Sequence, residues 1–115
     1  MKDETVYLKD LLAHVQRISQ FTAEGKDVFL KDEKTQFAVI RAYEVIGEIA
    51  KRLPQSLRDS YPSINWRRLI GFRDFLAHNY EEVILEFVWK AVEDLPNLQA
   101  AVEVLLSAAT KDDTG

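Results

Sequence analysis

Apolar residues recur along most of this chain at three- and four-residue intervals, the spacing of one face of an α-helix. No segment alternates apolar and polar residues between hairpin turns, as a half-buried strand would. The pattern predicts an all-α fold, an antiparallel bundle of four to five helices with short connections. Two of those connections, at 27–30 and 55–63, have room for a single helical turn. The expected helices run from Asp3 or Thr5 to about Glu24, from Asp32 or Thr35 to Leu53, from Trp66 to about His78, from beyond Tyr80 through Ala91, and from Asp94 to about Ala109.

The second predicted helix, which ends before Pro54, is apolar over most of its circumference. We therefore expect it to be the central and most buried helix of the bundle. Its narrow polar face carries charged residues at helical spacing, namely Arg41, Glu44, Glu48 and Arg52. They form either a solvated strip that neutralises itself, with Glu48 and Arg52 as an i, i+4 pair, or a functional face in which Glu44 or Glu48 orients Arg73 across a helix interface.

The third predicted helix, which Asn65 is suited to cap, carries an arginine in the middle of its apolar face. Burying a guanidinium without a partner costs several kcal/mol, about 3 to 5 even when only the partner is missing. Arg73 therefore either pairs with an anion or opens onto a cleft. The apolar positions around it are Trp66, Leu69, Ile70, Leu76 and Ala77.

One of the two histidines of the chain, His78, follows five residues after Arg73. Imidazole is the one side chain that exchanges protons readily near neutral pH, so it can act as both acid and base. On one straight helix, five residues turn two side chains apart by about 140°. Either the helix ends near His78, with Asn79 suited to its C-terminal position, or a second copy of the chain completes a site. The other histidine, His14, is interpreted as a surface residue of the first helix.

Length and composition limit the fold and the chemistry. The 115 residues suit a single domain, expected to span residues 1–110, followed by a polar C-terminal tail at 111–115. The chain has no cysteine, which excludes disulfides, thiolate catalysis and cysteine-bound zinc. No apolar run approaches the roughly 18 residues that span a bilayer, and the charged start of the chain lacks the apolar core of a signal peptide. We therefore expect a cytoplasmic protein that makes no membrane contact.

The formal net charge of −4 is unevenly distributed. The segment 51–73 contains six basic residues and a single acid. Such a segment produces the positive field that binding to a polyanion such as RNA requires. It predicts Arg52, Arg67 and Arg68 as RNA contacts, and the alternative is a solvated basic loop.

The chain has more large aromatic residues than one buried stripe per helix needs. We expect some of them to face a second chain and the protein to form an isologous homodimer. For any single residue, packing in the core is the simpler explanation. The residues concerned are Tyr43, Trp66, Phe72, Phe75, Phe87 and Trp89.

The segment Arg73-Asp-Phe-Leu-Ala-His78-Asn-Tyr80 reads R-x-x-x-x-H-x-Y. It resembles the signature of the HEPN superfamily, specifically the HepT toxins of HepT/MntA toxin–antitoxin pairs. Three further segments resemble that family in the same order, at 41–48, 64–74 and 88–96. The resemblance covers nearly the whole chain and includes no departure within the motif.

The resemblance implies a homodimeric HEPN-like bundle that cleaves RNA without a metal or other cofactor, at a site where two copies of the motif meet. It implies Arg73 and His78 as the catalytic pair. It also implies that an MntA-like minimal nucleotidyltransferase attaches AMP to Tyr80 and so silences the toxin, as in a type VII-like pair. The residues permit this chemistry, since His78 of each chain could transfer protons during attack by the 2′-hydroxyl and Arg73 could hold the phosphate. Asp74 could orient His78 or the arginine that acts with it.

Two other functions differ in class from this one. The chain could be a non-catalytic helical module that binds a nucleotidyltransferase and helps to hold its nucleotide, with the basic segment contacting nucleotide phosphates. A metal-dependent hydrolase is disfavoured, because no cluster of His, Asp and Glu has metal-ligand spacing. Cleavage of RNA in the presence of EDTA distinguishes the three.

Overall fold

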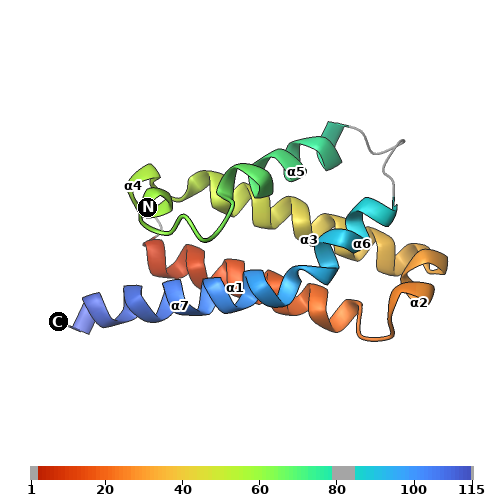
Figure 1. Cartoon of the computed structure of the whole chain (residues 1–115), viewed down its shortest axis with the longest axis horizontal. Coiled ribbons are helices and arrows are strands. Elements are labelled where there is room, and N and C mark those ends of the chain that lie inside the picture. The colour runs from red at the N-terminus through yellow and green to blue at the C-terminus, as the bar shows by residue number, and fades with distance from the viewer. Residues whose placement is uncertain (1–2, 79–84, 115) are drawn as a thin grey trace.

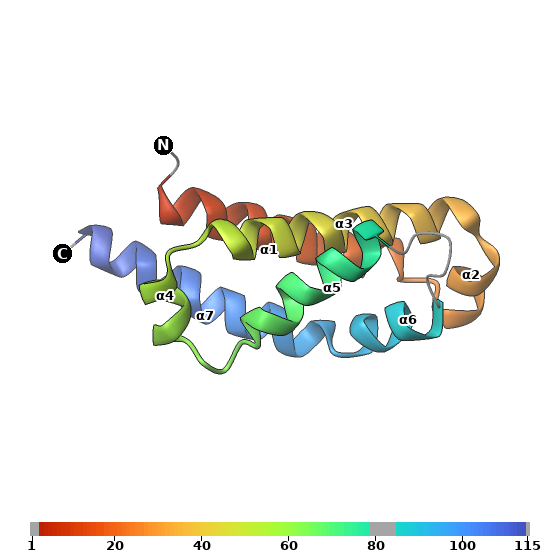
Figure 2. The ribbon, with the colours of Figure 1, turned by 90° about the horizontal axis from the view of Figure 1, so that it is seen from above.

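The computed structural model describes residues 3–78 and 85–114, which form seven helices and no strand. The long helices α1, α3, α5 and α7 run antiparallel in an elongated bundle of 49 × 27 × 24 Å (Figure 1, Figure 2). The predicted all-α antiparallel bundle is confirmed. The helices are α1 (Glu4–Phe21), α2 (Lys26–Lys31), α3 (Glu33–Arg52), α4 (Gln55–Ser60), α5 (Trp66–His78), α6 (Leu85–Glu93) and α7 (Leu95–Thr114).

α3 is the central helix, as its apolar circumference predicts. It packs against α1 on one side and α5 on another, and α1 packs in turn against α7. Figure 1 shows α5 along one side of the molecule and α7 beside α1 along the other. The buried residues of α3 are Val39, Ala42, Tyr43, Ile46, Gly47, Ile49 and Ala50.

Local signals in the sequence set several helix ends. The carboxylate of Asp3 accepts a hydrogen bond from the backbone N–H of Thr5 at 3.3 Å and caps α1. At the start of α5, Oδ1 of Asn65 accepts from the backbone N–H of Arg68 at 3.0 Å. Gly25 turns the chain from α1 into α2 with a φ of 96°, which residues with a Cβ rarely adopt. The predicted caps Asp3 and Asn65 are confirmed.

The structure has more helices than the four to five predicted, because both connections are themselves helical. The segments expected to hold one turn each form α2 and α4, and Pro54 precedes the latter. α7 continues to Thr114, into the segment 111–115 that we expected to be a tail. No proline or glycine interrupts the chain between Pro96 and Gly115, so nothing stops this helix earlier. Within the described residues, no helix combines the length and the hydropathy of a membrane span.

Most of the surplus aromatic residues pack in the core. The rings of Tyr43 and Phe72 meet edge to face, with centroids 5.3 Å apart, and Trp66 is buried. Phe75 on α5 and Phe87 on α6 are 37% and 52% exposed. Of the six aromatics, these two are therefore the candidates for contact with a second chain.

Two side-chain contacts join α6 to α2. The ring of Trp89 packs against the buried Phe29 with centroids 5.4 Å apart. Nζ of Lys26 pairs with the carboxylate of Glu86 at 2.9 Å, and this hydrogen-bonded ion pair raises the pKa of Lys26. Both partners of the ion pair are solvent-exposed, so we assign most of the stabilisation to the aromatic contact.

Two neighbouring residues of α7 test the packing of the core. Leu105 is 1% exposed and Val104 is 63% exposed. We expect Leu105→Ala to lower the free energy of unfolding by about 2–5 kcal/mol, because the substitution removes buried methyl groups and leaves a cavity. Val104→Ala should change it by less than about 0.5 kcal/mol. Urea denaturation measures both, and equal losses would contradict the assignment of the inner face of α7.

Candidate active site

α5 carries the predicted catalytic residues, and its ends are those predicted from the sequence. It begins at Trp66, whose indole Nε1 donates a hydrogen bond to the carbonyl of Tyr61 at 3.2 Å. Its inner face is fixed by Leu76, which is buried in the core. It ends at His78. The helix is therefore anchored near both ends, which fixes the side chains on its outer faces.

α5 approaches α3 most closely at Gly47. A Cβ built on Gly47 would lie 2.2 Å from Cβ of Arg73 and 2.8 Å from the carbonyl oxygen of Leu69. Real Cβ atoms essentially never come within 3.0 Å of another heavy atom, so the crossing requires glycine here. The sequence analysis missed this residue, although a glycine inside a helical pattern often marks such a packing requirement.

Arg73 forms an ion pair with the adjacent residue, Asp74. Its Nη1 donates to Oδ1 of Asp74 at 2.9 Å, and the two side chains are 28% and 50% exposed. Solvent screens a pair this exposed, so its contribution to stability is at most about 1 kcal/mol. The bond occupies one of the five N–H donors of the guanidinium, so the group retains donors for a ligand.

The carboxylates of α3 do not orient Arg73 in the described part of the chain. Glu44 pairs with Arg41 at 3.4 Å and Glu48 pairs with Arg52 at 3.9 Å, both along α3 itself. The predicted i, i+4 pair is thus present, and the solvated strip is the better interpretation of this face. Gly47, rather than a carboxylate, is the residue of α3 that meets Arg73.

His78 is exposed and tethered to its own helix. Its Nδ1 lies 2.8 Å from the backbone carbonyl oxygen of Asp74. A carbonyl oxygen only accepts hydrogen bonds, so Nδ1 carries the hydrogen and Nε2 of the neutral ring keeps its lone pair. No described residue hydrogen-bonds to Nε2. The ring is therefore oriented with its basic nitrogen available.

His14 makes the same tether but differs in one contact. Its Nδ1 lies 2.8 Å from the carbonyl oxygen of Asp10, one turn earlier in α1. Its Nε2 lies 3.2 Å from Nη1 of Arg17, and since arginine only donates, the lone pair of His14 is occupied. Both histidines thus contact a backbone carbonyl through Nδ1. Arg17 occupies the Nε2 of His14, whereas no described residue occupies that of His78.

Arg73 and His78 do not share one face of α5. The helix remains regular through His78, so the two side chains diverge by about 140° in ideal geometry. The side chain of Arg73 leaves α5 at the crossing with α3, and this contact fixes the direction in which the side chain starts. A single phosphate is therefore poorly placed to contact both groups of one chain.

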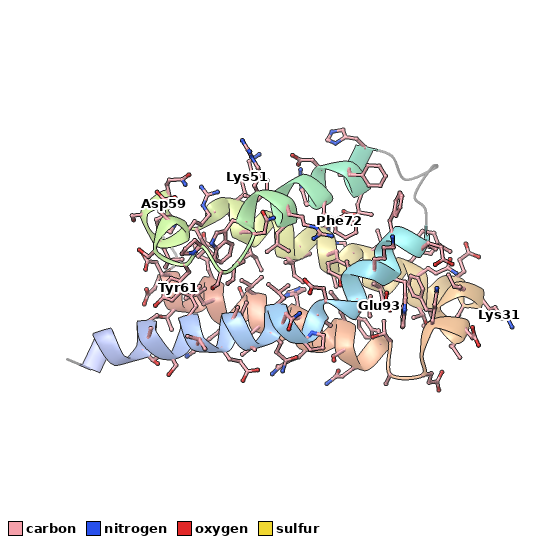
Figure 3. All side chains as sticks on the ribbon, in the orientation of Figure 1. Lys31, Lys51, Asp59, Tyr61, Phe72 and Glu93 are labelled. Carbon is pink, nitrogen blue, oxygen red and sulfur yellow. The ribbon has the colours of Figure 1, made fainter. Side chains whose placement is uncertain are left out.

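The predicted RNA contacts lie toward the other end of α5. Arg67 and Arg68 occupy its first turn and are exposed, as is Arg52 at the end of α3. At 1.5 Å per residue, the first turn lies about 15 Å along the axis from His78. Figure 3 shows Lys51, from the same basic segment, projecting outward from the bundle.

Tyr80, the residue expected to receive AMP, lies outside the described residues, as does Asn79. Among the side chains of residues 3–78 and 85–110, no three of His, Asp or Glu gather closely enough to hold a metal ion.

Two glycines test the α3–α5 crossing. We expect Gly47→Ala to lower the free energy of unfolding by about 1–3 kcal/mol, because the new methyl group overlaps Arg73 and the backbone of α5. Gly71, within α5, has no described atom within 4 Å of an added Cβ. Gly71→Ala should therefore raise the free energy of unfolding by about 0.5–1 kcal/mol, the usual gain in a helix interior. Chemical denaturation measures both, and an unchanged stability of Gly47→Ala would contradict the close approach.

Comparison with known proteins identifies relatives along nearly the whole chain. The probable ribonuclease HepT of Thermococcus cleftensis is 44% identical over 101 residues, which cover 86% of this chain and 92% of the relative. A candidate RNase of Methanocaldococcus jannaschii is 38% identical over 114 residues, covering 97% and 94%. Another, of Caldanaerobacter subterraneus subsp. tengcongensis, is 30% identical over 111 residues, covering 92% and 96%. No solved structure matches the chain significantly.

A protein-family model described as ribonuclease HepT-like matches residues 11–105. The match extends from α1 into α7 and contains all of α5, including Arg73, Asp74 and His78. The resemblance to HepT that the R-x-x-x-x-H-x-Y motif indicated is thereby confirmed. Together with relatives that align over most of their own length, the match shows that this chain belongs to the HepT-like ribonuclease family.

Proposed function

We propose that this protein is an endoribonuclease that cleaves RNA without a metal ion and uses Arg73 and His78 as its catalytic pair. The observation that carries the proposal is the state of His78, an exposed imidazole whose Nδ1 is tethered at 2.8 Å and whose Nε2 keeps its lone pair. Membership of a ribonuclease family supports RNA as the substrate.

In this proposal, Nε2 of His78 accepts the proton of a ribose 2′-hydroxyl. The 2′-oxygen attacks the adjacent phosphorus, so that the bond from O2′ to phosphorus forms and the bond from phosphorus to the 5′-oxygen breaks. A protonated His78 from a second protomer gives its proton to the departing 5′-oxygen. The products are a 2′,3′-cyclic phosphate and a 5′-hydroxyl.

Arg73 stabilises the charge on the phosphoryl oxygens during this displacement. Guanidinium is always protonated and offers a planar fork of donors to phosphate oxygens. Asp74 holds one of those donors at 2.9 Å and so limits the directions that the others take. A guanidinium oriented before the substrate binds loses less free energy to reorganisation during the reaction. Asp74 is thus a positioning residue for Arg73.

A homodimer would bring the second histidine to the site. The divergence of Arg73 and His78 on one helix favours a site completed by another copy of α5. The exposed rings of Phe75 and Phe87, on α5 and α6, supply apolar surface that a second copy would cover. Arg52, Arg67 and Arg68 would contact the RNA backbone away from the cleaved bond, which makes RNA affinity fall as salt rises.

An MntA-like minimal nucleotidyltransferase is the partner that this proposal includes. The motif continues from His78 to Tyr80, two residues later, which matches the tyrosine that receives AMP in the HepT family. An attached AMP would add bulk and a negative phosphodiester close to the imidazole and so repel RNA. The protein would then be the toxin of a toxin–antitoxin pair, silenced by its partner.

The two histidines test the catalytic assignment. We expect the wild-type protein to cleave RNA in EDTA and His78→Ala to lower the rate at least about 100-fold, the contribution of a general acid–base group. His14→Ala should retain the wild-type rate, since the Nε2 of His14 is already occupied by Arg17. Electrophoresis of end-labelled RNA measures the rates. Undiminished cleavage by His78→Ala would overturn the assignment, and tight binding of a nucleotidyltransferase without RNA cleavage would favour the non-catalytic module.

The mass of the intact protein tests the regulatory assignment. When the protein is produced together with a minimal nucleotidyltransferase encoded beside it, we expect mass to be added in AMP-sized steps. Tyr80→Phe should abolish the addition, whereas Tyr61→Phe, a matched tyrosine within the described residues, should retain it. Intact-protein mass spectrometry measures both, and an unmodified wild-type protein would count against AMP attachment.

A further inference from the structure

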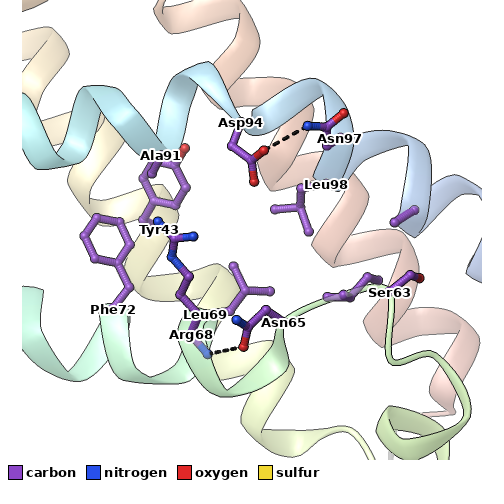
Figure 4. Close-up of a pocket in the computed structure, with 12 residues that line it drawn as sticks. Tyr43, Ser63, Asn65, Arg68, Leu69, Phe72, Ala91, Asp94, Asn97 and Leu98 are labelled. Atoms are coloured by element: carbon purple, nitrogen blue, oxygen red, sulfur yellow. Dashed lines mark hydrogen bonds between the residues drawn. The ribbon is translucent and has the colours of Figure 1, made fainter.

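A cavity of about 170 Å³ lies between α3, the first half of α5 and the junction of α6 and α7 (Figure 4). Engineered cavities of about 150 Å³ hold benzene, so this one has room for a single planar ring system. Its walls are largely apolar, and Figure 3 shows Phe72 on the side of α5 that faces the interior. The apolar side chains that line it are Ile64, Leu69, Phe72, Ala91, Leu98 and Ala101.

Hydrogen-bond donors and hydrogen-bond acceptors line the same cavity. Figure 4 shows Arg68 extending from α5 toward the side on which Asp94 projects from the α6–α7 junction. Asp94 accepts a hydrogen bond from Nδ2 of Asn97 at 2.9 Å through Oδ1, which leaves Oδ2 as an acceptor. No described carboxylate pairs with Arg68, so its donors are available as well. The cavity therefore offers both donors and acceptors to a bound molecule.

The hydroxyl of Tyr43 marks this cavity as a binding site. Tyr43 lines the cavity, is 3% exposed, and its hydroxyl has no hydrogen-bond partner among the described residues. Leaving such a group unpaired destabilises the folded state, and a ligand with a polar edge would supply the missing partner. Burial, and then the charge of Asp94, raise the pKa of Tyr43, so its hydroxyl remains a neutral donor.

We propose that this cavity binds one nucleobase, which lies against the ring of Phe72 and presents its polar edge to Tyr43 and Asp94. Nucleobases combine flat faces that stack on aromatic rings with donors and acceptors in the ring plane. An aliphatic molecule would leave the hydroxyl of Tyr43 without a partner, and Asp94 would repel an isolated phosphate. Arg68 would contact the sugar or phosphate attached to the base.

The inference deepens the proposed ribonuclease function. The cavity lies along the first half of α5, and Arg68 on its wall is about 15 Å along the helix axis from His78, so a base held there belongs to a nucleotide away from the cleaved phosphodiester and contributes to sequence preference. That placement rests on the proposed function, whereas the binding of a base does not. The two are therefore tested by separate measurements.

Titration with the four ribonucleoside 5′-monophosphates, followed by calorimetry, tests base binding directly. Ala101→Leu fills the cavity and should weaken binding at least tenfold. Ala100→Leu adds the same side chain at the neighbouring, exposed position and should leave the affinity within twofold of wild type. Ribose 5-phosphate should not bind. Equal affinity for ribose 5-phosphate, or equal binding by both variants, would overturn the proposal.

Tyr43→Phe separates ligand recognition from folding. Because the hydroxyl has no partner in the free protein, we expect its removal to leave the stability unchanged or increased while nucleotide affinity falls at least fivefold. A loss of stability with unchanged nucleotide affinity would show that the hydroxyl serves the fold and would overturn its role as a ligand contact.

RNA cleavage then links the cavity to the reaction. We expect Ala101→Leu to change the base preference at a nucleotide away from the cleaved bond, and His78→Ala to lose cleavage but keep nucleotide binding. Cleavage by wild-type protein that binds no nucleotide would overturn the cavity proposal and retain the nuclease. Nucleotide binding by wild-type protein that cleaves no RNA would overturn the nuclease and retain the cavity.

Discussion

The crossing of α3 and α5 at Gly47 is the contact on which the position of α5 and of Arg73 depends. Because Gly47 has no side chain, the first carbon of the Arg73 side chain occupies the space that a Cβ of α3 would take. The aliphatic part of Arg73 thus packs between the helices, while its guanidinium stays partly exposed and bonded to Asp74. An arginine in the middle of an apolar helix face is tolerated here without burial of its charge.

Small differences in hydrogen bonding distinguish the two histidines of this bundle. His14 and His78 bind the same kind of backbone carbonyl at the same distance, yet an arginine occupies the basic nitrogen of one and no described residue occupies that of the other. Within the described residues, the Nε2 of His14 is therefore occupied and that of His78 is not. The same reasoning separates the cavity beside α5 from ordinary packing defects, since its buried hydroxyl lacks the partner that folded proteins normally provide.

The helices, their order and most of their ends were predictable from the sequence, because apolar periodicity and caps such as Asp3 and Asn65 act locally. The short helices α2 and α4 were not fully anticipated, since six residues carry too little periodicity. The sequence left open whether Glu44 and Glu48 form a solvated strip or orient Arg73, because spacing alone does not tell which side of α3 meets α5. Tyr43 of α3 and Asp94 of the α6–α7 junction line one cavity, a proximity that has no signal in a single sequence.

The hydrogen bond between Nδ1 of His78 and the carbonyl oxygen of Asp74 attaches the imidazole to the last turn of α5. Helix ends fray before helix centres, and fraying of this turn separates Nδ1 from the carbonyl that fixes the ring and its tautomer. The share of molecules in which the ring is held in this orientation then follows the share in which the turn is wound. A shift of about 1.4 kcal/mol in that local equilibrium changes the unwound-to-wound ratio tenfold. Any event that loosens the terminus of α5 would thereby free the imidazole without displacing Arg73, whose first side-chain carbon lies at the crossing with α3.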